Sequence, residues 1–194
     1  MDVPGLHYLP NWLSEAAQRS VLASVDAAPW SAELRRRVQH YGHRYDYGRR
    51  SVAGGESERV TAPVPAWAAE LAERLHAEGY TAEPPDQVIV NEYEPGQGIS
   101  AHVDCVPCFG PAVAAISLGS SCVMDFIAPG GATRVGVPLE PGSLSVMTGE
   151  SRYTWKHAIV ARKSDPGPFG RVQRGRRVSV TFRTVVRDAG GDTR

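Results

Sequence analysis

The stretch RRVSVTFRTVV at residues 176–186 alternates polar and apolar side chains, which is the pattern of a β-strand with one buried face. The apolar face would carry Val178, Val180 and Phe182. The opposite face would carry four polar side chains, namely Arg177, Ser179, Thr181 and Arg183. Inward-facing arginines are costly unless they meet anions, and a guanidinium can grip a carboxylate in two places. The apolar face of this strand therefore predicts packing in a core, and its arginine-bearing face predicts a bound acid.

Seven further β-rich runs, separated by Pro and Gly, precede this strand. They are QVIVNEY (87–93), ISAHVD (99–104), AVAAISL (112–118), CVMDFI (122–127), TRVGV (133–137), SLSVM (143–147) and HAIV (157–160). So many short strands in about a hundred residues are typical of a sandwich or jelly roll. We predict a mainly β protein with flanking α-helices and a double-stranded β-helix (jelly-roll) fold.

Two amphipathic helices are expected ahead of the β-rich region, and both would cover a sheet. The first begins after Ser14, a suitable N-cap residue, and is ended by Pro29; the second runs from about Pro65 to Glu78. Residues 162–175 are rich in Pro, Gly and Arg and are expected to form a loop.

The chain has 194 residues, which predicts a single domain over 1–187, with helices and a lid at 1–85, a jelly-roll core at 86–187 and a disordered tail at 188–194. Its 42% hydrophobic and 22% charged residues exclude disordered, collagen-like and coiled-coil classes. No apolar run is long enough to span a membrane. Three cysteines are an odd number and too few to staple this fold, so we expect a reducing, cytoplasmic location. We also expect a monomer.

Positive charge is concentrated in two segments although the net charge is zero. Residues 35–50 hold six arginines against one acid, and residues 162–187 hold eight basic residues against one acid. Together they would form one positive face for a polyanion. The alternative is two solvated basic loops that balance an acidic helix.

The strongest chemical signal is His102-x-Asp104. Residues two apart on a strand leave the same face of the sheet, so the two side chains can share one ion. His157, at the start of a later run, is available as a third ligand. Two histidines and one carboxylate are the ligand set of non-haem Fe(II) oxygenases. On another strand, Asn91 and Tyr93 share a face and offer amide and phenol donors.

In these residues the chain resembles the AlkB family of Fe(II)- and 2-oxoglutarate-dependent dioxygenases. The resemblance covers about residues 86–186 and depends on Asn91-x-Tyr93, His102-x-Asp104, GESR at 149–152 before His157, and Arg177 with Arg183. It implies Fe(II), 2-oxoglutarate and dioxygen as cofactors, with the metal held by His102, Asp104 and His157. It further implies a cosubstrate site whose residues are Asn91, Tyr93, Arg177, Ser179 and Arg183.

Some positions depart from the family pattern. Ser179 stands where a well-known member has asparagine, and Ala158 follows the distal histidine where glycine is usual. Val106 replaces an aspartate that contacts the base in a bacterial repair member, so base selection is left open. The wording of several motifs, such as MTGESRYTWKH (147–157), is similar to the branch that hydroxylates a modified wobble uridine in tRNA.

The pair Cys105-x-x-Cys108 directly follows the aspartate. A zinc site or a redox pair are alternatives, but further zinc ligands are not evident. We expect these two residues to be packing or loop cysteines, and Cys122 to lie in the core.

The segment RRRVQHYGHRYDYGRR (35–50) mixes arginines with tyrosines, which suits phosphate contact and base stacking. An amphipathic strand packed on the barrel edge is an equal alternative; the resemblance favours a nucleotide-recognition lid. The substrate-binding candidates are Arg44, Tyr45, Tyr47 and Arg134.

The resulting hypothesis is a dioxygenase that oxidises an alkylated or modified base in nucleic acid, by oxidative demethylation or hydroxylation of DNA or RNA, including tRNA. The base would be single-stranded or flipped out of a duplex. The alternatives are a non-catalytic jelly roll that binds nucleic acid, and a hydroxylase of protein or small molecules.

Overall fold

The structure is a computed structural model that describes residues 2–31, 36–43, 45–46, 51–52 and 62–186. Its centre is a six-stranded antiparallel sheet. In spatial order the strands are β1 (Leu6–Leu9), β10 (Leu144–Met147), β7 (Phe109–Gly119), β14 (Arg177–Val185), β5 (Gln87–Tyr93) and β2 (Val38–Gly42). The strand predicted at residues 176–186 is thus β14, in the interior of the larger sheet.

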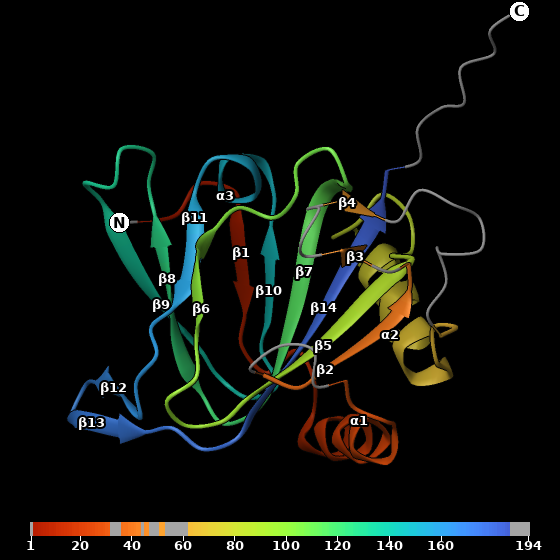
Figure 1. Cartoon of the computed structure of the whole chain (residues 1–194), viewed down its shortest axis with the longest axis horizontal. Helices are drawn as coiled ribbons and strands as arrows, with labels where there is room; N and C mark the ends of the chain where they lie inside the picture. Colours follow the sequence, from red (N-terminus) through yellow and green to blue (C-terminus); the bar gives the residue numbers. More distant parts are fainter. Residues whose placement is uncertain (1, 32–35, 44, 47–50, 53–61, 187–194) are drawn as a thin grey trace, which may run out of the picture.

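A smaller four-stranded sheet faces the larger one (Figure 1). Its strands, in spatial order, are β6 (Ile99–His102), β11 (Lys156–Ile159), β8 (Cys122–Ile127) and β9 (Arg134–Leu139). Apolar side chains from both sheets meet between them: Val113 and Met147 of the larger sheet share a cluster with Phe126 of the smaller. Two facing antiparallel sheets confirm the expected fold class, and their arrangement is consistent with a jelly roll.

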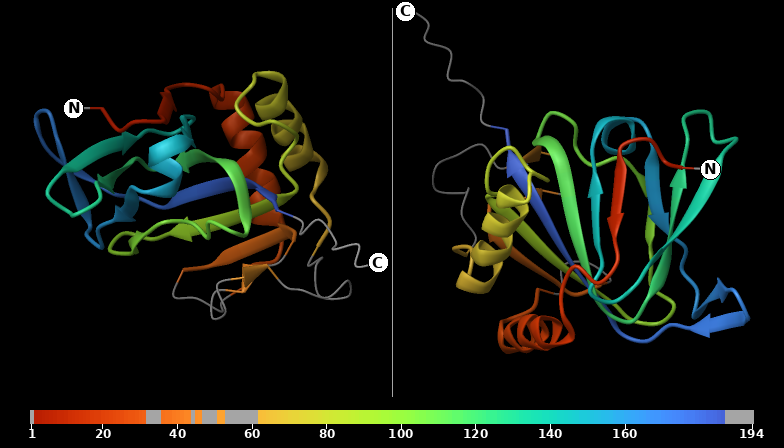
Figure 2. Two further views of the ribbon diagram at one scale, coloured as in Figure 1. Left: turned by 90° about the horizontal axis from the view of Figure 1, so that it is seen from above. Right: turned by 180° about the vertical axis from the view of Figure 1, so that it is seen from behind.

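Helices cover the outer face of the larger sheet, as Figure 2 shows. α1 (Glu15–Ala27) and α2 (Ala66–Ala77) pack their apolar sides onto that face. The buried cluster there joins Val25 and Leu75 to Val178, Val180 and Phe182 of β14. Both helices were expected, and the Ser14 hydroxyl accepts the backbone N–H of Ala17 as an N-cap.

The polar face of β14 points the other way, into the space between the sheets. Arg177 and Ser179 are buried there. Since strand side chains alternate, burying the apolar residues under the helices forces the arginines inward. The inward direction of this face places Arg177 and Ser179 between the two sheets, where the candidate site lies.

Three local features were not predicted from the sequence. Residues 162–175, expected to be a loop, contain a hairpin of β12 (Ser164–Gly167) and β13 (Gly170–Gln173). GESR lies in a short helix, α3 (Gly149–Tyr153), whose N-terminus is capped by a capping box between Thr148 and Ser151. Cys105 and Cys108 lie in a loop, as expected, but they form a disulfide, which only the redox-pair alternative had allowed. Cys122 is buried and free, as predicted.

The basic N-terminal segment is only partly described. Its residues 38–42 form the edge strand β2, where Tyr41 is buried and donates its hydroxyl to Gln39. A two-stranded hairpin of β3 (Tyr45–Asp46) and β4 (Ser51–Val52) follows. The predicted tail at 188–194 lies outside the described residues. In the part of the chain that is described, no helix has the length and apolarity to cross a membrane.

Candidate metal centre and cosubstrate pocket

His157 meets His102 and Asp104, from a segment about fifty residues earlier, between the sheets. One ligand atom from each of His102, Asp104 and His157 lies within 4.8 Å of the others. The two histidine Nε2 atoms lie 3.4 Å (His102) and 3.9 Å (His157) from the same carboxylate oxygen, Oδ1 of Asp104. Two imidazoles and one carboxylate around a common point are the donor set that non-haem Fe(II) favours, so these residues fit that ion.

Strand pairing brings the histidines together. His102 ends β6 and is the register partner of His157 on β11, and their ring centroids lie 4.3 Å apart. The Nδ1 atom of His102 lies 2.7 Å from the carbonyl oxygen of Ser100. A proton on Nδ1 that is donated to this carbonyl leaves the lone pair on Nε2, which faces the site.

Both charge and burial prepare the group for a cation. Burial by itself would raise the pKa of the Asp104 carboxyl, but the charge of Arg183 and the two histidines hold it well below its usual value. Arg183 donates from Nε to Oδ2 of Asp104 at 3.0 Å and leaves Oδ1 toward the histidines. Burial lowers the pKa of His157 to about 4. The carboxylate and the neutral imidazole are the protonation states that bind metal.

Arg152, from the GESR motif, holds the loop that carries the aspartate. Its side chain is fully buried at 1% exposure, and it donates to the backbone carbonyls of Asp104 and Cys105, each at 3.1 Å. It also donates to the carbonyls of Phe109 and Gly110, at the start of β7. The Cys105–Cys108 disulfide closes the same loop. The motif was visible in the sequence, but which carbonyls the guanidinium contacts was not.

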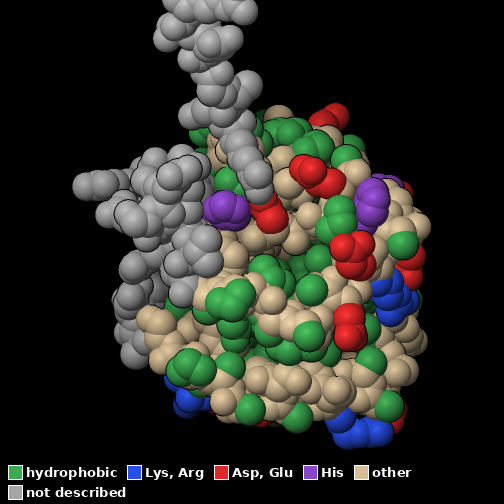
Figure 3. Space-filling model, turned by 90° about the vertical axis from the view of Figure 1, so that its right-hand side faces the viewer, with side chains coloured by type: hydrophobic (Ala, Val, Ile, Leu, Met, Phe, Trp, Pro, Cys, Tyr) green, Lys and Arg blue, Asp and Glu red, His purple; other side chains and the backbone are tan. Residues whose placement is uncertain are grey.

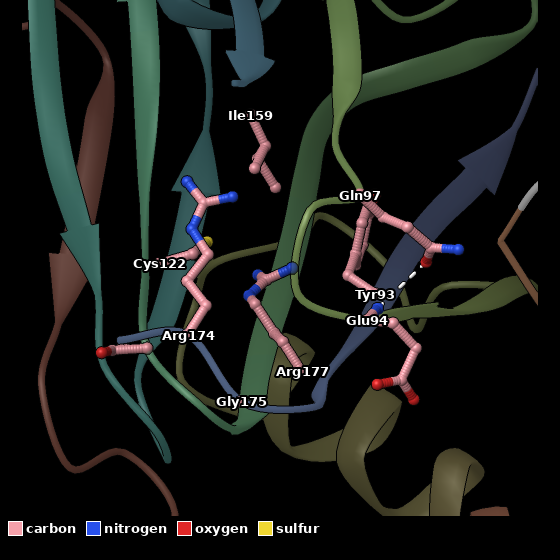
Figure 4. Close-up of a pocket in the computed structure, with 9 residues that line it drawn as sticks. Tyr93, Glu94, Gln97, Cys122, Ile159, Arg174, Gly175 and Arg177 are labelled. Atoms are coloured by element: carbon pink, nitrogen blue, oxygen red, sulfur yellow. Dashed lines mark hydrogen bonds between the residues drawn. The ribbon is translucent and has the colours of Figure 1, made fainter. Parts of the chain in front are cut away.

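A pocket lies between the sheets near the start of β14 (Figure 4). Tyr93 and Arg177 line it together with Cys122 and Ile159, which supply apolar surface. Arg177 is 3% exposed, and its Nη2 donates to the hydroxyl of Ser117 at 2.9 Å. Within the described part of the chain, its buried Nε and Nη1 atoms have no hydrogen-bond partner. Two unpaired donors on a buried guanidinium are the complement of a carboxylate.

Asn91 and Ser179 belong to the same inner face. They are register partners on β5 and β14, and both are buried. Arg36, which the sequence did not single out, donates from Nε to Oδ1 of Asn91 at 2.8 Å. Its guanidinium also lies 5.8 Å from the ring centroid of Tyr93. Arg36, from the segment ahead of β2, thus places an additional cation beside two of the predicted cosubstrate residues.

Among the substrate-binding candidates, Arg134 has a described side chain, and it is not brought to this site. Arg134 lies on the exposed face of β9 and pairs with Asp125 at 3.3 Å. The neighbouring Val135 packs inward against Phe126, so alternation directs Arg134 away from the metal group. The position of its side chain does not support a role at the metal group, and its assignment to substrate binding stays a prediction. Arg44, Tyr47 and the side chain of Tyr45 lie outside the described residues.

A protein-family comparison matches residues 5–183 to the 2OG-Fe(II) oxygenase superfamily. The chain belongs to this superfamily. The expected class, a 2-oxoglutarate-dependent non-haem iron dioxygenase, and the cofactors Fe(II), 2-oxoglutarate and dioxygen are thereby confirmed.

Individual relatives place the chain near the AlkB homologues of the superfamily. Mouse (Mus musculus) tRNA (carboxymethyluridine(34)-5-O)-methyltransferase ALKBH8 is 36% identical over 210 residues, which cover 95% of this chain and 31% of the mouse protein. The Arabidopsis thaliana alkylated DNA repair protein ALKBH8 homolog is 31% identical over 208 residues, which cover 95% of this chain and 59% of that protein. The chain therefore spans about a third of the mouse relative's length.

The fold agrees with that of a solved homologue. The structure of OsALKBH1 superposes with a TM-score of 0.71 at 18% sequence identity and covers 95% of this chain and 98% of that chain. At this identity the superposition supports the mainly β fold.

Proposed function

We propose that this superfamily member oxidises a modified or alkylated base in single-stranded or flipped-out nucleic acid. The observation that carries the proposal is the pairing of two features between the sheets: the His102, Asp104 and His157 group, and the buried Arg177 with two donors to spare. A structural arginine would have its donors satisfied inside the protein.

In this proposal His102, Asp104 and His157 hold the iron. Arg177, with Tyr93 and Asn91, holds the distal carboxylate of 2-oxoglutarate, and Ser179 lies in the floor between them. Arg183 keeps Asp104 ionised and oriented. When bound, iron with 2-oxoglutarate and dioxygen supplies the oxidation of a nearby C–H bond. The protein's contribution is to orient the cosubstrate and to keep water from the buried anchor.

The nucleic-acid substrate is supported by what the relatives are named for. The mouse relative's name refers to a tRNA uridine and that of the Arabidopsis relative to alkylated DNA. A buried reaction centre also requires the base to leave any duplex stack before it can react. We therefore expect oxidation of single-stranded, looped or flipped bases. We keep the predictions of a cytoplasmic location and a monomer as part of this proposal.

The test is succinate release from 2-oxoglutarate with Fe(II) in air, with methylated DNA oligomers, methylated RNA and whole tRNA compared. One of these should raise turnover above the substrate-free rate and gain a hydroxyl or lose a methyl group by mass spectrometry. Anaerobic Fe(II) plus 2-oxoglutarate should give a visible charge-transfer band that His102→Ala abolishes. The band without any nucleic-acid oxidation, together with turnover of a protein or small molecule, would contradict the substrate assignment alone.

A further inference from the structure

The β12–β13 hairpin projects from the end of the molecule at which β14 begins (Figures 1 and 2). Its strands pair from Ser164 with Gln173 to Gly167 with Gly170, so Pro168 and Phe169 form the tip. Phe169 is fully exposed, and Val172 is 47% exposed on the same hairpin. A large aromatic ring held in water at the tip of a projecting element is the kind of exposed apolar group that marks a contact surface.

The hairpin is held in a defined position by a buried ion cluster at its base. Asp165 is 4% exposed and accepts hydrogen bonds from Arg162 and Arg174. The backbone N–H of Val123, on β8, also donates to Asp165 at 3.2 Å. Arg171, on β13, donates to the hydroxyl and carbonyl oxygens of Ser164 at the base of the hairpin. The exposed ring is therefore presented by an ordered support, which lowers the entropy cost of binding.

The two basic segments of the sequence meet at one buried carboxylate. Arg37, ahead of β2, and Arg176, ahead of β14, both donate to Glu92. Along the chain, basic residues also lie on the hairpin and directly before it. We call the exposed and partly exposed members of this set the basic strip; they are Arg37, Arg162, Lys163, Arg171 and Arg176.

The side chains visible on one side of the molecule differ in character from the basic strip. Figure 3 shows the right-hand side of the molecule in Figure 1, where apolar and acidic side chains gather and few lysines or arginines are visible. Within the basic strip, Lys163 and Arg171 are exposed, with Arg171 on β13 and Lys163 directly before β12, and the Arg37 side chain is 51% exposed. Positive charge interleaved with an exposed aromatic ring suits a chain of phosphates and unstacked bases.

We propose that the β12–β13 hairpin and the basic strip form a second contact surface for single-stranded nucleic acid, outside the pocket. Phe169 stacks on a base of the strand, while Lys163 and Arg171 contact neighbouring phosphates and Arg37 contacts the strand further along. The surface holds the flanking strand and thereby adds affinity without touching the base that is oxidised. This inference rests on the proposed function, because it presumes a nucleic-acid substrate.

The experiment measures binding of a fluorescein-labelled single-stranded RNA oligomer and of whole tRNA by fluorescence anisotropy. Phe169→Ala and Phe169→Leu should each weaken binding about tenfold, since base stacking on an aromatic ring contributes about that factor or more. Phe169→Trp should keep the wild-type affinity, because the ring is retained. Phe169→Leu keeps an apolar side chain but removes the ring, so it separates base stacking from general apolar contact.

Charge is tested with a matched pair of lysines. Lys163→Gln should weaken binding and reduce the slope of log Kd against log salt by about 0.7, as expected for one phosphate contact on a single strand. Lys156→Gln removes the same charge from the exposed side of β11 and should leave the binding affinity and the salt slope unchanged. Thermal unfolding midpoints establish that each variant is folded.

The outcomes separate the two proposals. Wild-type protein that binds and oxidises nucleic acid, with Phe169→Ala binding equally well, overturns the hairpin surface and leaves the proposed function intact. Wild-type protein that neither binds nor oxidises any nucleic acid overturns both. Weakened binding by Phe169→Ala and Phe169→Leu, with recovery in Phe169→Trp, supports stacking at this tip.

Discussion

Replacing Arg177 with methionine should stabilise the protein without cosubstrate and, at the same time, weaken 2-oxoglutarate binding severely. The opposite signs follow from the surroundings of the side chain. Arg177 is 3% exposed, makes one hydrogen bond to Ser117, and keeps two buried donors without partners in the described part of the chain. Methionine has a similar length and fills the same space without charge.

The magnitude can be worked from these contacts. The substitution loses one hydrogen bond, about 1 kcal/mol, and a contact with the Tyr93 ring at 5.4 Å, about another 1 kcal/mol. It removes two unsatisfied buried donors at about 1 to 3 kcal/mol each. These terms give a net gain in the free energy of unfolding of about 0 to 4 kcal/mol, with a central value of about 2 kcal/mol. In a chain of 194 residues the central value raises Tm by roughly 4 to 8 °C.

Binding should change in the other direction. Two charge-assisted hydrogen bonds to a carboxylate contribute about 1.5 to 3 kcal/mol each, so Arg177→Met should raise the Kd for 2-oxoglutarate more than about 100-fold. Thermal unfolding with and without 2-oxoglutarate and Mn(II) in place of iron measures both quantities in one experiment. The wild-type Tm should rise with cosubstrate concentration, and the variant Tm should not.

Arg183→Met is the matched control. Its Nε pairs with Asp104 at 3.0 Å, so its removal leaves a buried carboxylate without its cation and should cost about 3 to 5 kcal/mol without metal. If Arg177→Met lowers Tm as Arg183→Met does, and still binds 2-oxoglutarate normally, Arg177 is a structural residue and the assignment of the pocket is wrong.

Two further predictions concern other parts of the molecule. Arg152→Ala should weaken binding of Fe(II) or Mn(II) at least tenfold, because Arg152 holds the backbone around Asp104 in place without touching a ligand atom. Arg152→Lys should partly restore the affinity. Metal titration followed by electron paramagnetic resonance measures the affinity, and an unchanged value would contradict this role. A hydrogen bond from Arg37 lowers the pKa of Glu92, burial opposes this effect, and a hydrogen bond from Arg176 lowers the pKa further. This stability is present above about pH 4.3, the ordinary glutamate value, and is lost as pH falls through the lower folded-state value. Glu92→Gln should therefore flatten the acid limb of a Tm against pH curve, and parallel curves for variant and wild type would refute the contribution.

Much of the site could be predicted because strand alternation is a local property. The inward face of β14 and the shared face of His102 and Asp104 follow from a period of two residues, whatever the strands pair with. The two cover helices follow equally from local capping and apolar spacing.

Other features depend on contacts between residues far apart in the chain. The stretch at 162–175 looked like a loop because Pro and Gly dominate its composition, yet Asp165 finds Arg174 and the N–H of Val123 and so stabilises a hairpin. The Cys105–Cys108 disulfide was not expected, since spacing alone does not distinguish linked from unlinked cysteines.

The sequence by itself determined the faces of the strands, the chemistry available on each face and the enzyme class those residues resemble. Only the tertiary structure decided that His157 pairs with His102, that Arg152 holds the backbone beside Asp104, that Arg134 points away, and that Arg37 and Arg176 converge on Glu92. The physical reason is that strand register and ion pairing between distant segments depend on the packing of the whole core, whereas alternation along one strand depends on backbone geometry alone.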